Sequence, residues 1–203
     1  MPGMTRGRRW SGWTSIIAAI GLLWMVTVVL GFSSLWDSDT NPAVVGTASP
    51  VWPASTSLNS TPGKIRLVFA LHPHCECSHA SLKELELLLK LSGKKVESYI
   101  LVLKPTGMPL EWVQSELYEE AREIHATVVI TDLGGTESKK FGLEASGQVL
   151  LYDARGNLAF SGGITPAASQ RGDCIGIQSI QAILSGELNY ERLAPVYGCS
   201  LFD

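Results

Sequence analysis

The sequence predicts an α/β domain, built as a central mixed sheet flanked by helices, behind an N-terminal transmembrane helix. Three observations predict this arrangement. Short β-rich runs alternate with helix-period segments, two consecutive β-rich runs form a hairpin late in the chain, and a charge-free apolar run lies near the N-terminus. Helical crossovers favour parallel strands, whereas the hairpin adds antiparallel ones, so the sheet is expected to be mixed.

The apolar run at the N-terminus is long enough to cross a membrane. No charged residue lies between Trp10 and Trp36, and about 20 apolar residues span the hydrocarbon core. The flanking charges are Arg6, Arg8 and Arg9 before the run and Asp37 and Asp39 after it. This asymmetry predicts a cytoplasmic N-terminus at residues 1–12, a transmembrane helix at 13–34, and a soluble domain facing the periplasm or exterior. A cleaved signal peptide is the alternative, although no small-residue cleavage site directly follows the run.

The rest of the chain divides into a tether and a domain. Residues 35–63 are rich in Ser, Thr, Pro and Gly and show no helix or strand period, so we expect a flexible linker there. Residues 64–203 form the predicted domain. The net charge of the chain is −3 with a pI near 5.8, and without a basic stripe it is not expected to bind nucleic acid.

The elements of the domain follow from their patterns. Ile65, Leu67 and Phe69 share one face of the first strand, and the leucines of the first helix recur at helical spacing. The charged residues of that helix, including Glu84 and Glu86, are expected to face solvent. The predicted elements are strands at 64–70, 98–103 and 126–131, helices at 82–90, 109–123, 136–144 and 177–186, and a hairpin at 148–163 with a turn at 153–157.

The segment LHPHCECSHASLKELELLL, residues 71–89, contains the residues best suited to catalysis or metal binding. Cys75 and Cys77 are one residue apart, and three histidines surround them: His72, His74 and His79. A thiolate is both a nucleophile and a metal ligand. If the helix begins near Cys77, its N-terminal dipole favours the thiolate. A capping box from Ser81 to Glu84 would instead leave the cysteines a turn outside the helix.

The order of strand, cysteine motif and helix, closed by a hairpin and a helix, resembles the thioredoxin fold. The N-terminal anchor is similar to membrane-tethered bacterial thioredoxin-like proteins. The strings HPHCECSHASLKEL, SGQVLLYDARGNLAFSGGIT and PVYGC further resemble RedB-type proteins over most of residues 51–203. Two features depart from ordinary thioredoxins: the spacing is Cys-x-Cys rather than Cys-x-x-Cys, and Ser146-Gly147 stands where thioredoxins carry a cis-proline.

The resemblance implies thiol-disulfide exchange with a protein substrate or redox partner. By analogy with the order in thioredoxins, Cys75 would be the exposed attacking thiol and Cys77 the resolving one. A disulfide over this short spacing closes a small ring and should be labile. No cofactor is needed for this reaction.

Two alternative functions use the same loop. His72, His74, Cys75, Cys77 and His79 supply thiolate and imidazole ligands that suit copper or zinc, so a metal-binding or metal-delivery module is one alternative. The other is a thioredoxin-like domain that binds a partner protein without catalysis. The sequence does not decide among the three.

Cys174 and Cys199 are the other two cysteines. Outside the cytoplasm two cysteines in a small domain are often bridged. A disulfide between this pair would close a 26-residue loop and stabilise the domain by about 3 kcal/mol. Alternatively, the tail folds back so that Cys199 resolves an intermediate at Cys75. The resemblance to RedB-type proteins includes the tail cysteine but has no clear match for Cys174.

Overall fold

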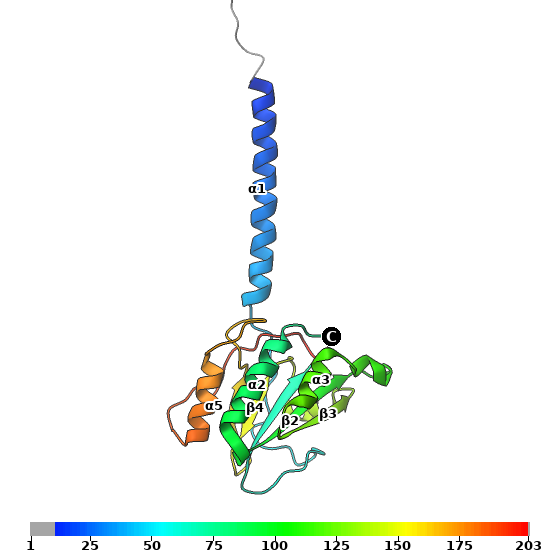
Figure 1. Cartoon of the computed structure of the whole chain (residues 1–203), viewed down its shortest axis with the longest axis vertical. Coiled ribbons are helices and arrows are strands. Elements are labelled where there is room, and N and C mark those ends of the chain that lie inside the picture. The colour runs from blue at the N-terminus through cyan, green and yellow to red at the C-terminus, as the bar shows by residue number, and fades with distance from the viewer. Residues whose placement is uncertain (1–10, 203) are drawn as a thin grey trace, which may run out of the picture. The chain divides into compact units, whose positions relative to one another are not determined.

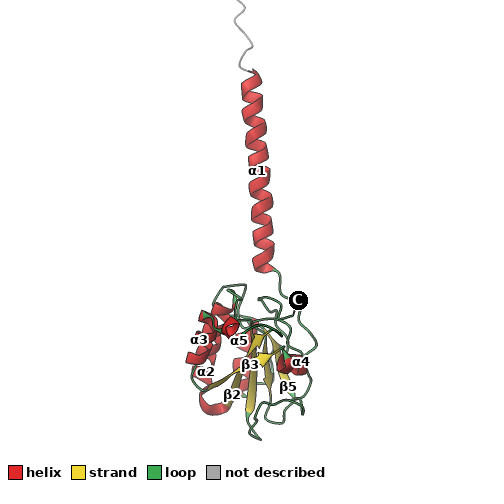
Figure 2. Ribbon diagram, turned by 90° about the vertical axis from the view of Figure 1, so that its right-hand side faces the viewer, coloured by secondary structure: helices red, strands yellow, loops and turns green. Residues whose placement is uncertain are grey.

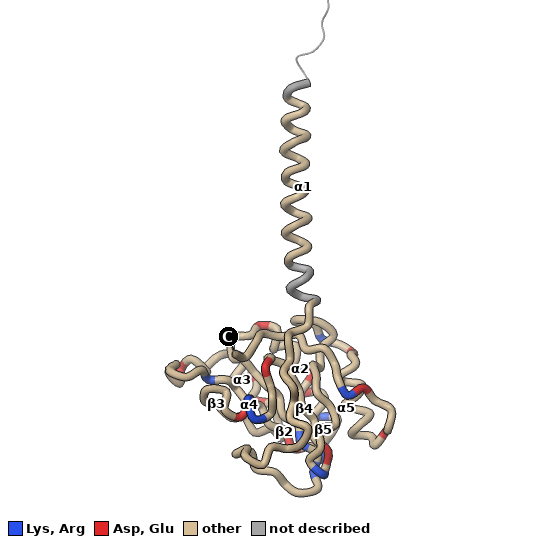
Figure 3. Tube along the Cα trace, turned by 180° about the vertical axis from the view of Figure 1, so that it is seen from behind, with Lys and Arg blue, Asp and Glu red and all other residues tan. Residues whose placement is uncertain are grey.

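The computed structural model describes residues 11–202 and divides the chain into two units, Met1–Asp39 and Thr40–Asp203. The first unit holds all but the last residue of α1 (Ser11–Thr40), the long helix labelled in Figure 1. Within it, Trp13–Ser34 is long and apolar enough to cross a membrane, with a mean hydropathy of 2.4. Figure 3 shows no charged residue on this part of α1. The span has the predicted bounds, and its length and composition are consistent with a membrane anchor or a signal sequence.

Several residues used to predict the orientation of α1 lie outside the described part of the chain. Arg6, Arg8, Arg9 and Trp10 are not described, and neither are the side chains of Trp36, Asp37 and Asp39. The predicted orientation of α1 across a membrane therefore rests on the sequence alone.

The second unit is built on a five-stranded mixed sheet in the order β3-β2-β1-β4-β5. Strands β1, β2 and β3 run parallel, whereas β4 is antiparallel to β1 and to β5. The strands are β1 (Ile65–Leu71), β2 (Val96–Lys104), β3 (Thr127–Leu133), β4 (Val149–Tyr152) and β5 (Leu158–Gly162). The predicted α/β class and mixed sheet are confirmed.

Helices cover both faces of this sheet. On one face lie α2 (Ser78–Ser92), α3 (Glu116–Glu123) and α5 (Ile175–Ser185), and on the other lies α4 (Thr136–Phe141) (Figure 2). The two-residue period of β1 divides the core: Leu67 and Phe69 pack with the leucines of α2, while Val68 and Ala70 pack with Phe141 of α4.

The single helix predicted at 109–123 is wrong. It splits into a 3-10 turn, η2 (Leu110–Val113), and α3; a second 3-10 turn, η1 (Gly93–Lys95), follows α2. The cause of the split is Ser115, whose extended backbone and side-chain oxygen cap α3 by accepting the N–H of Tyr118 at 3.2 Å.

The solvent-facing position predicted for Glu84 is also wrong. Its side chain is 6% exposed and accepts a hydrogen bond from Arg171 Nε at 3.0 Å. Arg171 comes from the loop before α5, so this contact joins α2 to that loop. A buried carboxylate needs such a partner.

Much of the segment expected to be a flexible linker packs on the domain. Trp52 lies 5.0 Å from Phe141 and 5.4 Å from Tyr152, centroid to centroid, and Leu58 is buried in the same cluster. The Ser57 N–H and hydroxyl donate to the Glu137 carboxylate. Aromatic burial therefore fixes residues that composition alone assigned to a tether.

Candidate functional site

The cysteine loop connects the carboxyl end of β1 to the start of α2. It is a series of tight turns, in which Cys75 N donates to His72 O at 3.1 Å and Ser78 N donates to Cys75 O at 2.8 Å. Cys77 is the N-cap residue of α2, with φ −60° and ψ −24°. The helix therefore begins at the cysteines, and Ser81 lies buried inside its first turns rather than capping it. This places the positive end of the helix dipole beside the loop.

The C-terminal tail crosses directly over Cys75. The backbone N–H of Cys199 donates to Cys75 Sγ at 3.2 Å, and its carbonyl accepts the Ser146 N–H at 2.8 Å. One residue pair further on, Leu201 N donates to Glu144 O at 2.8 Å, and the Leu201 side chain is buried in the core. The tail is thus anchored at the contact between the two cysteines and again two residues beyond it.

The three cysteines at this site differ in accessibility. Cys75 is fully buried, Cys77 is half-buried and Cys199 is exposed. The expectation that Cys75 is the exposed attacking thiol is wrong for this state, because the tail covers it. Each of the four cysteines, all in the described part of the chain, is a thiol.

Ser146, which the resemblance to thioredoxins places near the position of their cis-proline, is buried beside the cysteine loop. Its hydroxyl accepts the backbone N–H of His72 at 2.8 Å and lies 2.7 Å from the Ser78 hydroxyl. All of Ser146 is buried. A Cβ at Gly198 would lie 2.0 Å from the Ser146 carbonyl oxygen, so the tail needs glycine there to approach so closely. In the sequence, the only signal at this position was the absence of a proline.

Hydrogen bonds make Cys75 the more acidic of the two contacting thiols. Burial acts to raise the pKa of Cys75, but hydrogen bonds from the Cys199 thiol, the Ser78 hydroxyl and the Cys199 N–H outweigh it, so the pKa lies below its ordinary value. Burial, the hydrogen bond to Cys75 and the charges on Cys75 and Cys77 raise the pKa of Cys199. The arrangement therefore favours a thiolate on Cys75 and the proton on Cys199.

Two of the loop histidines lie against Trp112, whereas the third lies beside Glu120. His74 Nε2 lies 2.9 Å from the Trp112 carbonyl oxygen, and the His72 ring lies 5.5 Å from the Trp112 ring. His79 Nδ1 lies 3.2 Å from a carboxylate oxygen of Glu120. Among residues 11–202 no group of three or more His, Cys, Asp or Glu side chains is placed to hold a metal ion. The five predicted metal ligands are close in sequence but are not gathered in space.

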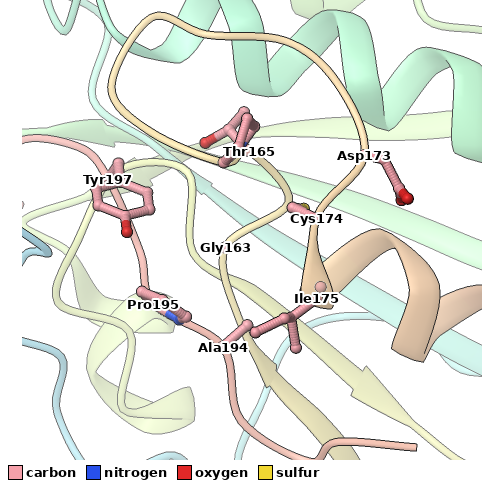
Figure 4. A pocket seen from close by; sticks show the side chains of 10 residues that line it. Gly163, Thr165, Asp173, Cys174, Ile175, Ala194, Pro195 and Tyr197 are labelled. Carbon is pink, nitrogen blue, oxygen red and sulfur yellow. The ribbon is translucent and has the colours of Figure 1, made fainter. Parts of the chain in front are cut away.

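Cys174 belongs to a different part of the surface. It is the N-cap residue of α5 and lines a cavity with Thr165, Pro195 and Tyr197 (Figure 4). Burial raises the pKa of its thiol. Cys199 contacts Cys75 rather than Cys174. The structure therefore favours the alternative in which the tail folds back over the cysteine loop.

Comparison with known proteins supports the fold at low sequence identity. No protein-family profile matches the chain, and no curated protein does. An uncharacterized conserved protein from Geobacillus kaustophilus superposes with a TM-score of 0.54 at 14% identity, covering 80% of this chain and 94% of that one. A hypothetical protein from Sinorhizobium meliloti gives 0.50 at 17% identity, covering 80% and 96%.

A more distant match is a secreted Mycobacterium tuberculosis disulfide oxidoreductase homologous to E. coli DsbE. It superposes with a TM-score of 0.43 at 10% identity, covering 62% of this chain and 83% of that one. The strand order, the antiparallel β4–β5 hairpin and the cysteine loop between β1 and α2 define the class of the domain. The domain has a thioredoxin-like fold.

Proposed function

We propose that this protein carries out thiol-disulfide exchange at Cys75. The observation that carries the proposal is the contact of Cys199 with Cys75, made by the backbone N–H and the thiol of Cys199, at the start of α2 in a thioredoxin-like fold. The lowered pKa of Cys75 supports it, because the thiolate is the reactive form of cysteine.

The exchange needs a second sulfur beside Cys75. A thiolate that attacks a disulfide forms a mixed disulfide and releases one thiolate, and a second cysteine then displaces the other half of the substrate. Cys77 is the candidate by analogy with the order of cysteines in thioredoxins, and Cys199 is a candidate because it contacts Cys75. The protein substrate or redox partner supplies the other pair of sulfurs, and no cofactor takes part.

The test compares two cysteine variants of the full chain in detergent. With oxidised glutathione, Cys75→Ser is expected to stop at a mixed disulfide and to release no second glutathione, as followed by mass spectrometry of the protein and of released glutathione. Cys174→Ser is the matched control, because Cys174 lies in a separate cavity, and it should exchange as the unmodified chain does. Full exchange by Cys75→Ser would refute the proposed function.

We propose in addition that α1 anchors the domain in the cytoplasmic membrane, with the domain on the outer side. The support is the 22-residue apolar span Trp13–Ser34, together with the arginines that precede it in the sequence. Alkaline extraction should leave the full-length chain in the membrane, and external protease should digest its domain. A shortened chain in the soluble fraction would instead identify the segment as a cleaved signal.

The closer similarity to RedB-type proteins stays a hypothesis based on the quoted motifs. Metal delivery is not favoured over exchange, because the predicted ligands are not gathered among the described residues.

A further inference from the structure

Cys75 and Cys77 are poorly arranged to form a disulfide with each other. The hydrogen bonds from Ser78 N to Cys75 O and from His79 N to Glu76 O wind residues 75–79 into a helix-like turn. Cys77 itself has helical backbone angles. Side chains two positions apart on a helix do not face each other. A bond between these two sulfurs would therefore require the turn to unwind at the start of α2.

Cys199 is the cysteine that the fold presents to Cys75. Its backbone N–H lies 3.2 Å from Cys75 Sγ, and the tail is held there by the pairing of Ser146 N with the Cys199 carbonyl. Cys75 is completely buried where the tail crosses it, whereas Cys199 is exposed. A thiol from solution thus reaches Cys199 before it reaches Cys75.

We propose that Cys75 and Cys199 form the exchanging disulfide and that an incoming substrate thiolate attacks the sulfur of Cys199, releasing Cys75. This inference rests on the proposed function and deepens it by naming the bond and the sulfur attacked first. It reverses the order expected by analogy with thioredoxins, in which Cys75 is the exposed attacking thiol. It also assigns the substrate as a dithiol, which the bridged protein oxidises.

The sequence of steps balances without a cofactor. The substrate thiolate forms a bond to Cys199 Sγ, the Cys75–Cys199 bond breaks, and the electron pair leaves on Cys75. The second substrate thiolate then attacks the substrate's own sulfur in the mixed disulfide, and Cys199 leaves and takes up a proton. The substrate has lost two electrons and the protein has gained them. A disulfide-bonded partner reoxidises the pair by the reverse exchange.

The electrostatics of the site suit this direction of attack. The thiol of lower pKa is the better leaving group, and the hydrogen bonds at Cys75 lower its pKa while that of Cys199 is raised. The product of the reaction is a Cys75 thiolate beside a protonated Cys199. This is the protonation state that the contacts between the two residues stabilise.

The first experiment locates the sulfur that is attacked. The full chain carrying Cys77→Ser and Cys174→Ser is oxidised with oxidised glutathione, purified in detergent, mixed with reduced glutathione and quenched with acid at increasing times. Peptide mass spectrometry then locates the glutathione adduct. The adduct is expected on Cys199, at least tenfold above Cys75 at the earliest times. A larger fraction on Cys75 would overturn the inference, while the exchange itself would still support the proposed function.

The second experiment uses Cys199→Ser with Cys75 and Cys77 both present. Its exchange with glutathione should fall at least tenfold, whereas Cys77→Ser should retain most of the exchange. If Cys199→Ser exchanges at the rate of the unmodified chain, Cys77 is the second sulfur and the inference fails. If no variant and not even the unmodified chain exchanges, the proposed function fails with it.

Discussion

The acidity of Cys75 should depend on the side chain at position 199. We consider the full chain in which Cys77 and Cys174 are serine and position 199 is either Ala or Ser, so that Cys75 is the one remaining cysteine. Cys199→Ala removes the side-chain donor to Cys75 but keeps the backbone N–H at 3.2 Å. Cys199→Ser replaces the thiol with a hydroxyl donor of similar size.

The magnitude follows from the hydrogen bond that is lost. A hydrogen bond to a charged group is worth about 1.5–3 kcal/mol, and sulfur is a weak acceptor, so the low end applies to the hydroxyl that Cys199→Ser supplies. One pKa unit corresponds to about 1.4 kcal/mol, so the pKa of Cys75 should be about one unit higher in the Ala variant than in the Ser variant. Absorbance at 240 nm against pH reports the thiolate directly, with a cysteine-free chain subtracted for tyrosine. Equal pKa values in the two variants, or the reverse order, would refute the role of the tail side chain.

Three further predictions concern the structure around the site, each measured by urea unfolding of the full chain in detergent. Gly198→Ala should destabilise by about 1–3 kcal/mol and expose Cys75 to alkylation, because the new methyl group meets the Ser146 carbonyl oxygen; slow alkylation at unchanged stability would contradict this. Arg171→Ala should cost about 1–3 kcal/mol by leaving the buried Glu84 carboxylate without its donor, and adding Glu84→Gln should recover part of that loss. Burial acts to raise the pKa of Glu137, but its hydrogen bonds outweigh this and lower the pKa to about 2. The ionised side chain therefore stabilises the fold above pH 4.5, and this stabilisation, at most about 3 kcal/mol, disappears as the pH falls toward 2. Glu137→Gln should flatten this part of the stability profile, and an unchanged slope would contradict the prediction.

The fold was predictable because its signals are local. The alternation of β-rich runs with helix-period segments predicted the order of the elements, and the two-residue period of β1 predicted that Leu67 and Phe69 share a face. The turn after β4 was visible in the residues between the two strands of the hairpin. Each of these patterns lies within a few residues of the element that it specifies.

The features that escaped prediction depend on contacts between distant residues. Glu84 reads as a surface residue in its helix, yet Arg171, 87 positions later, allows it to be buried. Trp52 lies in a stretch of linker-like composition but packs on Tyr152 of β4. Ser115 is the exception, since its capping position could have been found as a local signal before the acidic first turn of α3.

The candidate site was predicted in part. The pattern of strand, cysteines and helix located Cys75, and the resemblance offered Cys199 as its partner. The burial of Cys75 was not predicted, because it depends on how the tail crosses the loop at Gly198 and pairs with Ser146. A spacing in sequence cannot show which of two thiols a tail leaves exposed.

The most direct test of the account is to map the disulfides of the unmodified full chain across a series of glutathione redox buffers. Digestion after acid quenching and alkylation would report the state of every cysteine at each potential. The account predicts a Cys75–Cys199 disulfide that forms and disappears reversibly, while Cys174 stays a thiol throughout. A Cys75 thiol that persists under all oxidising conditions would contradict the central claim that this residue is a redox centre.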